Sequence, residues 1–205
     1  MNNFELSSFL QNIYEDYKKY TSSISTNVMA SSFECVQLFI NLCENSKPSR
    51  VMDMGSGFSS VALRRYKKIC GYDIEIVSVD TDILWLNKTT SFLKELNLSV
   101  DNLYGINDFI KTNHGIFDLI LYDMGHYQNG TRQQWIPFVI NECIHSNSSI
   151  LFDDTNNIHY FLFIMEYLST TCQFTMTNTR PITNDQFGRY SMLFNNISLL
   201  HNKII

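Results

Sequence analysis

The sequence predicts a doubly wound α/β fold with a mostly parallel sheet and an antiparallel strand pair near the C-terminus. From residue 50 onward, short runs that are apolar on both faces alternate with helix-length segments, as in a parallel sheet covered on both sides. The last two strand-like runs lack a helix between them, which favours antiparallel pairing. A chain of 205 residues suits one sizeable core. We expect one domain over residues 1–205, with helices in 1–48 and an α/β core in 49–205.

The first fifty residues carry helical signals. Apolar residues recur at spacings of three and four over Phe4–Tyr20 and over Ser32–Glu44, which predicts two helices. Ser31 and Ser32 are candidate N-caps of the second helix, and Pro48 marks its end. The intervening TSSISTNVMAS is small and polar without periodicity, so we expect a loop there.

The later runs predict the strands. Five parallel strands are expected at Arg50–Met54, Ile74–Val79, Leu103–Tyr104, Phe117–Tyr122 and Ser149–Phe152. Two more, Gln173–Thr177 and Tyr190–Phe194, are joined by the polar segment TNTRPITNDQFG, which shows no helical pattern. We expect these two to pair at one edge of the sheet.

Composition narrows the class of function. A net charge of −5 with scattered basic residues disfavours nucleic acid as a partner. Five cysteines without a CxxC pair indicate neither a disulfide framework nor a zinc site. No signal peptide or membrane-length apolar run is present, so we expect a cytoplasmic protein without a membrane partner. A small-molecule substrate is favoured, and a homodimer stays open.

Acidic residues follow the expected strands, where open parallel sheets bind their ligands. They are Asp53, Asp80, Asp108, Asp123, and the adjacent pair Asp153 and Asp154. A single acid at a strand end is common, but acids after every strand predict a crevice lined by carboxylates. Such a crevice suits a ligand with hydroxyls, an amino group and positive charge.

The glycine turn in VMDMGSGFSS follows the first of these strands. Gly55 and Gly57 resemble the start of a dinucleotide fingerprint, but Ser59 or Ser60 stands where a third small residue, Gly or Ala, is expected. A nicotinamide oxidoreductase needs backbone amides aimed at a pyrophosphate, which an acidic crevice does not favour. S-adenosylmethionine fits the acidic crevice better.

With these motifs in this order, the chain resembles class I S-adenosylmethionine-dependent methyltransferases over about residues 25–195. The resemblance implies a Rossmann-like fold and assigns roles to the acids. Asp53 would lie near the methionine amino group, Asp80 would bind the ribose hydroxyls, and Asp108 would lie near the adenine amino group. The cofactor loop would comprise Gly55, Ser56, Gly57, Phe58 and Ser59, with Asp123 also near the cofactor. Asp80 and Asp108 could instead cap helices, as we expect of Asp82.

The fourth and fifth strands narrow the resemblance. FDLILYDMGH and SILFDDTNN resemble the small metal-dependent O-methyltransferases of the catechol, caffeoyl-CoA and sugar types. The resemblance implies Mg²⁺ or Ca²⁺ bound by Asp123, Asp153 and Asp154, whose mutual repulsion calls for a cation. Two departures stand out: Asp-Asp-Thr replaces Asp-Asn, and Gly125 stands where some sugar enzymes have a further acid.

His126 stands three residues after Asp123, where the catechol and caffeoyl types carry a lysine base. The predicted catalytic residues are therefore His126, as the base that deprotonates an acceptor hydroxyl, and Asp123. His126 could instead orient the substrate. Asp118 is expected to be structural, and His145 and His159 to be ordinary surface or helix histidines. Candidate pocket walls are Tyr127, Trp135, Phe187 and Tyr190, and a loop over 180–189 could cover the pocket.

Three functions follow from this interpretation. The first is a small-molecule O-methyltransferase that uses S-adenosylmethionine and a divalent metal. The second is a metal-independent methyltransferase acting on a nitrogen or a sugar hydroxyl. The third is a non-catalytic binding protein with a methyltransferase fold, which the intact glycine turn and Asp80 disfavour.

Overall fold

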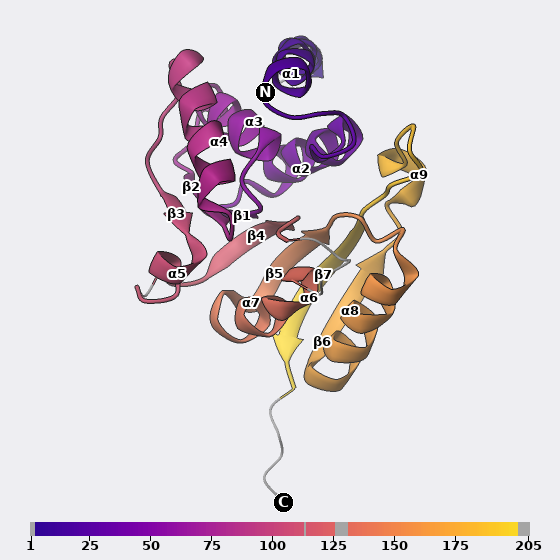
Figure 1. Ribbon diagram of the computed structural model, residues 1–205. Coiled ribbons are helices and arrows are strands. Elements are labelled where there is room, and N and C mark those ends of the chain that lie inside the picture. The colour runs from indigo at the N-terminus through magenta and orange to yellow at the C-terminus, as the bar shows by residue number, and fades with distance from the viewer. Residues whose placement is uncertain (1–2, 113, 126–130, 201–205) are drawn as a thin grey trace, which may run out of the picture.

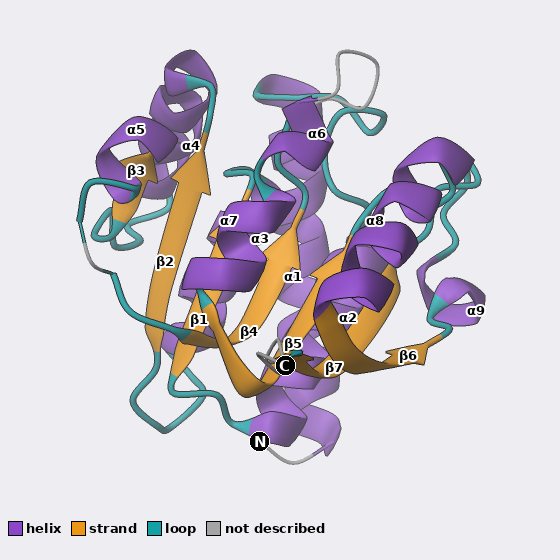
Figure 2. Ribbon diagram, turned by 90° about the horizontal axis from the view of Figure 1, so that it is seen from below, coloured by secondary structure: helices purple, strands orange, loops and turns teal. Residues whose placement is uncertain are grey.

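The computed structural model describes residues 3–112, 114–125 and 131–200, and these residues build one seven-stranded sheet. Its strand order is β3-β2-β1-β4-β5-β7-β6, and Figure 2 shows the strands in this order from left to right. The strands are β1 (Arg50–Met54), β2 (Glu75–Asp80), β3 (Leu103–Gly105), β4 (Phe117–Tyr122), β5 (Ile144–Phe152), β6 (Cys172–Thr177) and β7 (Met192–Leu199). β1 to β5 are parallel, and β7 runs antiparallel to both β5 and β6. The predicted fold class is confirmed.

The C-terminal strand pair differs from the prediction in its position. β6 and β7 are antiparallel neighbours, but β7 lies inside the sheet between β5 and β6. Of these two strands, only β6 therefore lies at an edge of the sheet. The connecting segment also contains a one-turn helix, α9 (Arg180–Thr183), which is too short to produce a helical pattern in the sequence.

Helices cover both faces of the sheet (Figure 1). One face carries α1 (Asn3–Ser23), α2 (Phe33–Ser46), α3 (Phe58–Lys67) and α4 (Ile83–Glu95). The other face carries α5 (Ile106–Phe109), α7 (Ile136–Glu142) and α8 (Ile158–Thr171). The short helix α6 (Thr131–Gln134) follows β4 and contacts α8. None of the helices in the described residues is long and apolar enough to cross a membrane.

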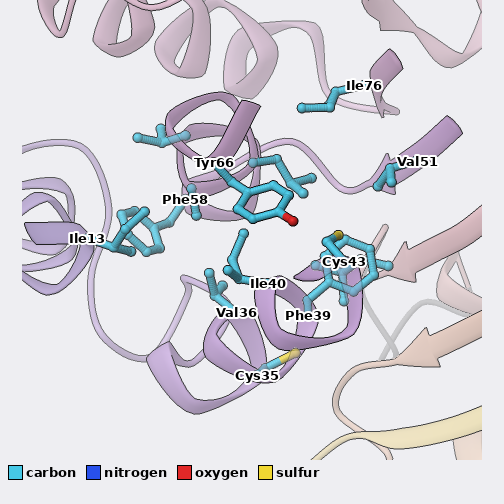
Figure 3. Close-up of a cluster of buried hydrophobic side chains, with 14 of the residues drawn as sticks. Ile13, Cys35, Val36, Phe39, Ile40, Cys43, Val51, Phe58, Tyr66 and Ile76 are labelled. Atoms are coloured by element: carbon cyan, nitrogen blue, oxygen red, sulfur yellow. The ribbon is translucent and has the colours of Figure 1, made fainter. Parts of the chain in front are cut away.

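Alternation along the strands divides the core into two clusters. In β1, Val51 packs with the cluster under α1 to α4, whereas Met52 belongs to the cluster under α7 and α8. Figure 3 shows the first cluster, in which Phe58 and Tyr66 of α3 face Val36 of α2. Because side chains alternate along a strand, Asp53 must lie on the same face as Val51, beneath α3. All five cysteines are buried and free.

Two serines before α2 have different tasks. Ser32 is the N-cap, and its hydroxyl accepts a hydrogen bond of 3.0 Å from the backbone N–H of Cys35. Ser31 turns away from the helix, and its hydroxyl donates to Asp123 at the end of β4. The loop before α2, predicted from its polar composition, is thereby attached to the carboxyl ends of the strands.

Candidate active site

A pocket of about 560 Å³ lies outside the carboxyl ends of the central strands. Strand order reverses between β1 and β4, and α/β proteins of this kind bind ligands at that point. The lining of the pocket includes residues 28–31, 55–58, 80–82 and 153–154, together with Tyr20, Trp85, Asp123, Gly125, Arg132 and Arg189. A second pocket of about 450 Å³, between α1, α2 and the turn at residues 185–186, contains none of the strand-end acids that follow β1 to β5.

The glycine turn forms the floor of the 560 Å³ pocket. Gly55 has φ of +109°, and a Cβ there would lie 2.6 Å from the backbone oxygen of Asp123, so no side chain fits. Its N–H donates a 2.8 Å hydrogen bond to the carbonyl of Val79. At Gly57 a Cβ would make ordinary contacts with the Tyr20 hydroxyl at 3.5 Å and the Trp85 ring nitrogen at 3.8 Å. Gly55 therefore lets β1 turn tightly against the end of β4, and Gly57 keeps the pocket open.

Asp80 ends β2 at the wall of the pocket. Its Oδ2 accepts hydrogen bonds from the backbone N–H and hydroxyl of Ser56, at 2.8 and 2.7 Å. Its Oδ1 accepts from the N–H of Asp82. Burial raises the pKa of Asp80, although these hydrogen bonds oppose the shift. Asp82 is the N-cap of α4, as predicted.

Asp53 does not reach the pocket. Its side chain points beneath α3, where Oδ2 accepts from the hydroxyls of Ser60 at 2.5 Å and Ser78 at 3.1 Å. Among the described residues its Oδ1 has no hydrogen-bond partner. Complete burial raises the pKa of Asp53 to about 6, against the opposing effect of Ser60, Ser59 and Arg64. The alternation of β1 accounts for this position, which a one-dimensional motif does not reveal.

Asp108 and Ser59 also lie away from the pocket lining. Asp108 is in α5, its side chain is 76% exposed, and its nearest charged partner is Lys111 at 3.6 Å. Ser59 is buried within α3. Ser56 and Phe58, in contrast, do line the pocket. The proposed adenine and loop contacts of Asp108 and Ser59 stay predictions without support from their placement.

Three carboxylates gather where β4 and β5 end. Asp123, Asp153 and Asp154 all line the pocket. Burial, followed by the charges of Asp123 and Asp154, raises the pKa of Asp153. Its Oδ1 accepts a 2.7 Å hydrogen bond from the hydroxyl of Ser191. The predicted convergence of these acids is present in the structure.

Arg132 lies among these carboxylates. Its Nη2 is 2.9 Å from Asp123 Oδ1 and 3.0 Å from Asp154 Oδ2. The guanidinium is nearly fully buried. Burial alone would lower the pKa of Arg132, but the charges of Asp123 and Asp154 outweigh this effect and raise it. The acids therefore already have a permanently charged partner.

These residues do not fit the Mg²⁺ or Ca²⁺ ion that the sequence resemblance implied. Arg132 and Ser31 occupy the two oxygens of Asp123, and Arg132 takes one oxygen of Asp154. Within residues 3–112, 114–125 and 131–200, no three His, Cys, Asp or Glu side chains are grouped to hold a metal ion. Both oxygens of Asp123 and one oxygen each of Asp153 and Asp154 are therefore already committed to protein hydrogen bonds, which leaves too few free oxygens for the roughly six or more that a hard cation needs.

Arg189 connects the two sides of the pocket mouth. Its guanidinium donates to the backbone carbonyls of Asn27, Val28 and Ala30 at 2.9, 2.6 and 3.0 Å. It also forms an ion pair of 2.7 Å with Asp185. The segment before α2 is thus attached to the hairpin formed by β6, β7 and their connection, residues 178–191. Val28 and Met29, in the segment before α2, are exposed and line the pocket.

The other predicted residues are distributed as follows. His126 and Tyr127 lie outside the described residues. Trp135 packs against the core cluster under α7 and α8 and does not line the pocket. Phe187 and Tyr190 are likewise absent from the lining. Asp118 is structural, as predicted. Its carboxylate accepts hydrogen bonds from the backbone N–H groups of Ser49 and Arg50 and lies 3.0 Å from Nε2 of His145.

Sequence reasoning missed Tyr20, Ser31, Trp85, Arg132 and Arg189 as pocket residues. One signal for Arg132 was available: it is the single Lys or Arg between Lys111 and Arg180, in a region with three acids that need a cation. The others come from distant parts of the chain, and no spacing along the sequence indicates that they meet.

Comparisons with known proteins bear on the fold. No protein-family model and no curated protein matches the sequence. The SAH-bound methyltransferase PaMTH1 of Podospora anserina matches with a TM-score of 0.65 at 15% identity, over 95% of this chain and 96% of that one. The O-methyltransferase TomG of Streptomyces achromogenes, involved in tomaymycin synthesis and solved with SAM, has a TM-score of 0.63 at 13% identity, over 93% and 89%.

An rRNA methylase from Streptococcus thermophilus also matches, with a TM-score of 0.53 at 11% identity, over 80% of this chain and 96% of that one. All three are described as methyltransferases or methylases, and at 11–15% identity their likeness to this chain shows the fold alone. Together with the strand order and the glycine turn after β1, these matches show that the chain has the fold of the class I S-adenosylmethionine-dependent methyltransferases.

Proposed function

We propose that this protein is an S-adenosylmethionine-dependent methyltransferase that methylates a hydroxyl group of a small molecule. One observation carries the proposal: a single pocket brings together the glycine turn after β1, Asp80 after β2 and the acids after β4 and β5. Its volume of about 560 Å³ lies in the range of small-ligand sites. The net charge of −5 speaks against the polyanionic acceptors of rRNA methylases.

Several residues would hold the cofactor. Asp80 presents a buried carboxylate beside the glycine turn, and a carboxylate can accept hydrogen bonds from two ribose hydroxyls. Tyr20 and Trp85 lie near Gly57 and close the pocket on that side. Bound S-adenosylmethionine supplies an electrophilic methyl group on a positively charged sulfonium. The surrounding carboxylates favour that charge.

The acids after β4 and β5 would manage the proton of the acceptor. Burial and like charges raise the pKa of Asp153, which makes its carboxylate a better proton acceptor than an exposed aspartate. His126, the base expected from the sequence, is three residues from Asp123 and stays a second candidate. Rate would come largely from positioning the hydroxyl in line with the methyl group.

Binding of S-adenosylhomocysteine, measured by calorimetry, tests the cofactor half of this proposal. We expect one site per chain, with affinity lost in Asp80→Ala. Methyl transfer from isotope-labelled cofactor to a panel of phenols, sugars and amines, read by mass spectrometry, tests the acceptor half. Absence of S-adenosylhomocysteine binding contradicts the enzyme proposal, binding without transfer to any panel member favours the non-catalytic alternative, and a methylated nitrogen contradicts the hydroxyl assignment.

A further inference from the structure

We propose that Arg132 is the built-in cation of this site and takes the place that a divalent metal holds in metal-dependent O-methyltransferases, so that the site functions without a metal ion. The inference rests on the proposed function, because it concerns the same pocket. It goes beyond that function by assigning a role to a residue that no motif includes.

The contacts of Arg132 are those expected of a bridging cation. A single nitrogen, Nη2, lies 2.9 Å from Asp123 and 3.0 Å from Asp154. These two acids follow different strands, β4 and β5, so one charge holds two elements together. An arginine stays charged at any physiological pH, and it therefore performs permanently the neutralisation that a metal provides only when bound.

The protein holds Arg132 from several sides. The hydroxyl of Tyr122 donates a 2.6 Å hydrogen bond to the Arg132 carbonyl, and the Tyr160 ring lies 5.5 Å from the guanidinium carbon. Gly125 has φ of +80°, and a Cβ there would lie 2.9 Å from the backbone nitrogen of Arg132. The glycine that replaces an acid of some sugar enzymes therefore admits the backbone of α6. The placement of Arg132 therefore depends on the absence of a side chain at position 125.

The guanidinium also keeps unused donors. Among the described residues, Nε and Nη1 of Arg132 and Oδ1 of Asp154 have no hydrogen-bond partner although they are buried. Buried polar atoms without partners are uncommon, and at a pocket wall they point to a ligand. The unused N–H groups suit an acceptor oxygen that carries negative charge, which is the second task of the metal in such reactions.

Titration with Mg²⁺ and with Ca²⁺ tests the proposal without any acceptor. The wild-type protein should show no heat of binding in calorimetry and no change of melting temperature between chelator and millimolar metal. Arg132→Gln leaves Asp123 and Asp154 without their cation, and these carboxylates should then bind a divalent ion. Its melting temperature should rise by several degrees on adding millimolar Ca²⁺.

Two controls separate this effect from general destabilisation. The double variant Arg132→Gln with Asp154→Asn removes one of the two newly exposed ligands and should lose the response to Ca²⁺. Arg64→Gln removes another buried arginine, which contacts Ser60, Ser78 and the carbonyl of Asp101 beneath α3. It should lower the melting temperature without creating a response to metal.

Wild-type binding of one divalent ion that Asp154→Asn abolishes would overturn the proposal. A folded Arg132→Gln protein that ignores both metals would also count against it. If Arg132→Gln does not fold, the wild-type titration still decides. Binding of S-adenosylhomocysteine by the same preparation is a separate readout, so failure of the proposed function and failure of this inference are distinguishable.

Discussion

The hydroxyl of Ser31 donates a 2.5 Å hydrogen bond to Oδ2 of Asp123, across 92 positions of sequence. Because hydrogen bonds to charged groups contribute about 1.5–3 kcal/mol, this contact should couple the two residues energetically. A double-mutant cycle with Ser31→Ala and Asp123→Asn, followed by urea unfolding, should give a coupling free energy of at least about 1 kcal/mol. The matched cycle with Ser32→Ala, which removes only the N-cap of α2, should give none. Equal coupling in both cycles would refute the assignment.

Asp80 and Asp82 offer a second matched comparison. Asp80→Asn removes a charged acceptor and should weaken S-adenosylhomocysteine binding by about ten- to a hundred-fold, equivalent to 1.5–3 kcal/mol. Asp82→Asn keeps the N-cap of α4, since Asn caps helices as well as Asp, and should leave affinity unchanged. Calorimetry measures both. Equal affinity losses would place the ribose contact elsewhere.

The two glycines of the turn should respond differently to alanine. Gly55→Ala combines a positive φ with a Cβ 2.6 Å from the Asp123 backbone, so we expect a loss of at least about 3 kcal/mol in the free energy of unfolding. Gly57 has an extended φ of 176°, and its Cβ would make an ordinary contact. Gly57→Ala should therefore fold with nearly wild-type stability. Chemical denaturation of both variants checks the ranking, and a reversed order would contradict it.

Asp53 should make stability depend on pH. Burial raises the pKa of Asp53 to about 6, so between about pH 4 and 6 the folded protein binds more protons than the unfolded chain. The free energy of unfolding must then fall as pH rises through this window, by up to about 3 kcal/mol from Asp53. Asp80 and Asp153 act in the same direction, so the comparison must be with Asp53→Asn. Urea unfolding at several pH values should show a smaller decline in the variant, and parallel profiles would disprove the assignment.

Arg189 should hold the segment before α2 in place. Arg189→Ala removes the donors to three backbone carbonyls in residues 27–30, so amide hydrogen exchange in that segment should accelerate. Arg180 lies in the same hairpin but packs on the Tyr190 ring. Arg180→Ala is thus the control and should leave exchange of residues 27–30 unchanged. Acceleration in both variants would indicate general loosening of the hairpin instead.

The sequence predicted those features that depend on local pattern. β1 and β4 have the expected bounds, because continuous apolar runs between helical segments specify buried strands. The position of β7 between β5 and β6 depends on long-range pairing that no local pattern encodes. The same holds within the site: Asp80 and Asp123 line the pocket, whereas the pleat of β1 turns Asp53 beneath α3.

The cation of the acidic cluster illustrates the same limit. Repulsion between Asp123, Asp153 and Asp154 correctly indicated that a positive charge is needed. The resemblance to metal-dependent enzymes suggested an ion, but the structure places the Arg132 side chain there. The need for a positive charge can be predicted from residue types alone. Which group supplies that charge depends on how α6 packs, and the sequence pattern does not indicate this.

The hydrogen bonds from Arg189 to the backbone carbonyls of residues 27–30 affect the order in which the pocket can form during synthesis. The ribosome makes the glycine turn, Asp80 and Trp85 early, together with α3 and α4 that support them. The wall formed by residues 28–31 is made earlier still, but it acquires its arginine only when residue 189 has emerged. During synthesis the glycine turn and Asp80 can therefore be assembled while the wall of residues 28–31 still lacks its arginine, and the pocket takes its final shape among the last events of folding.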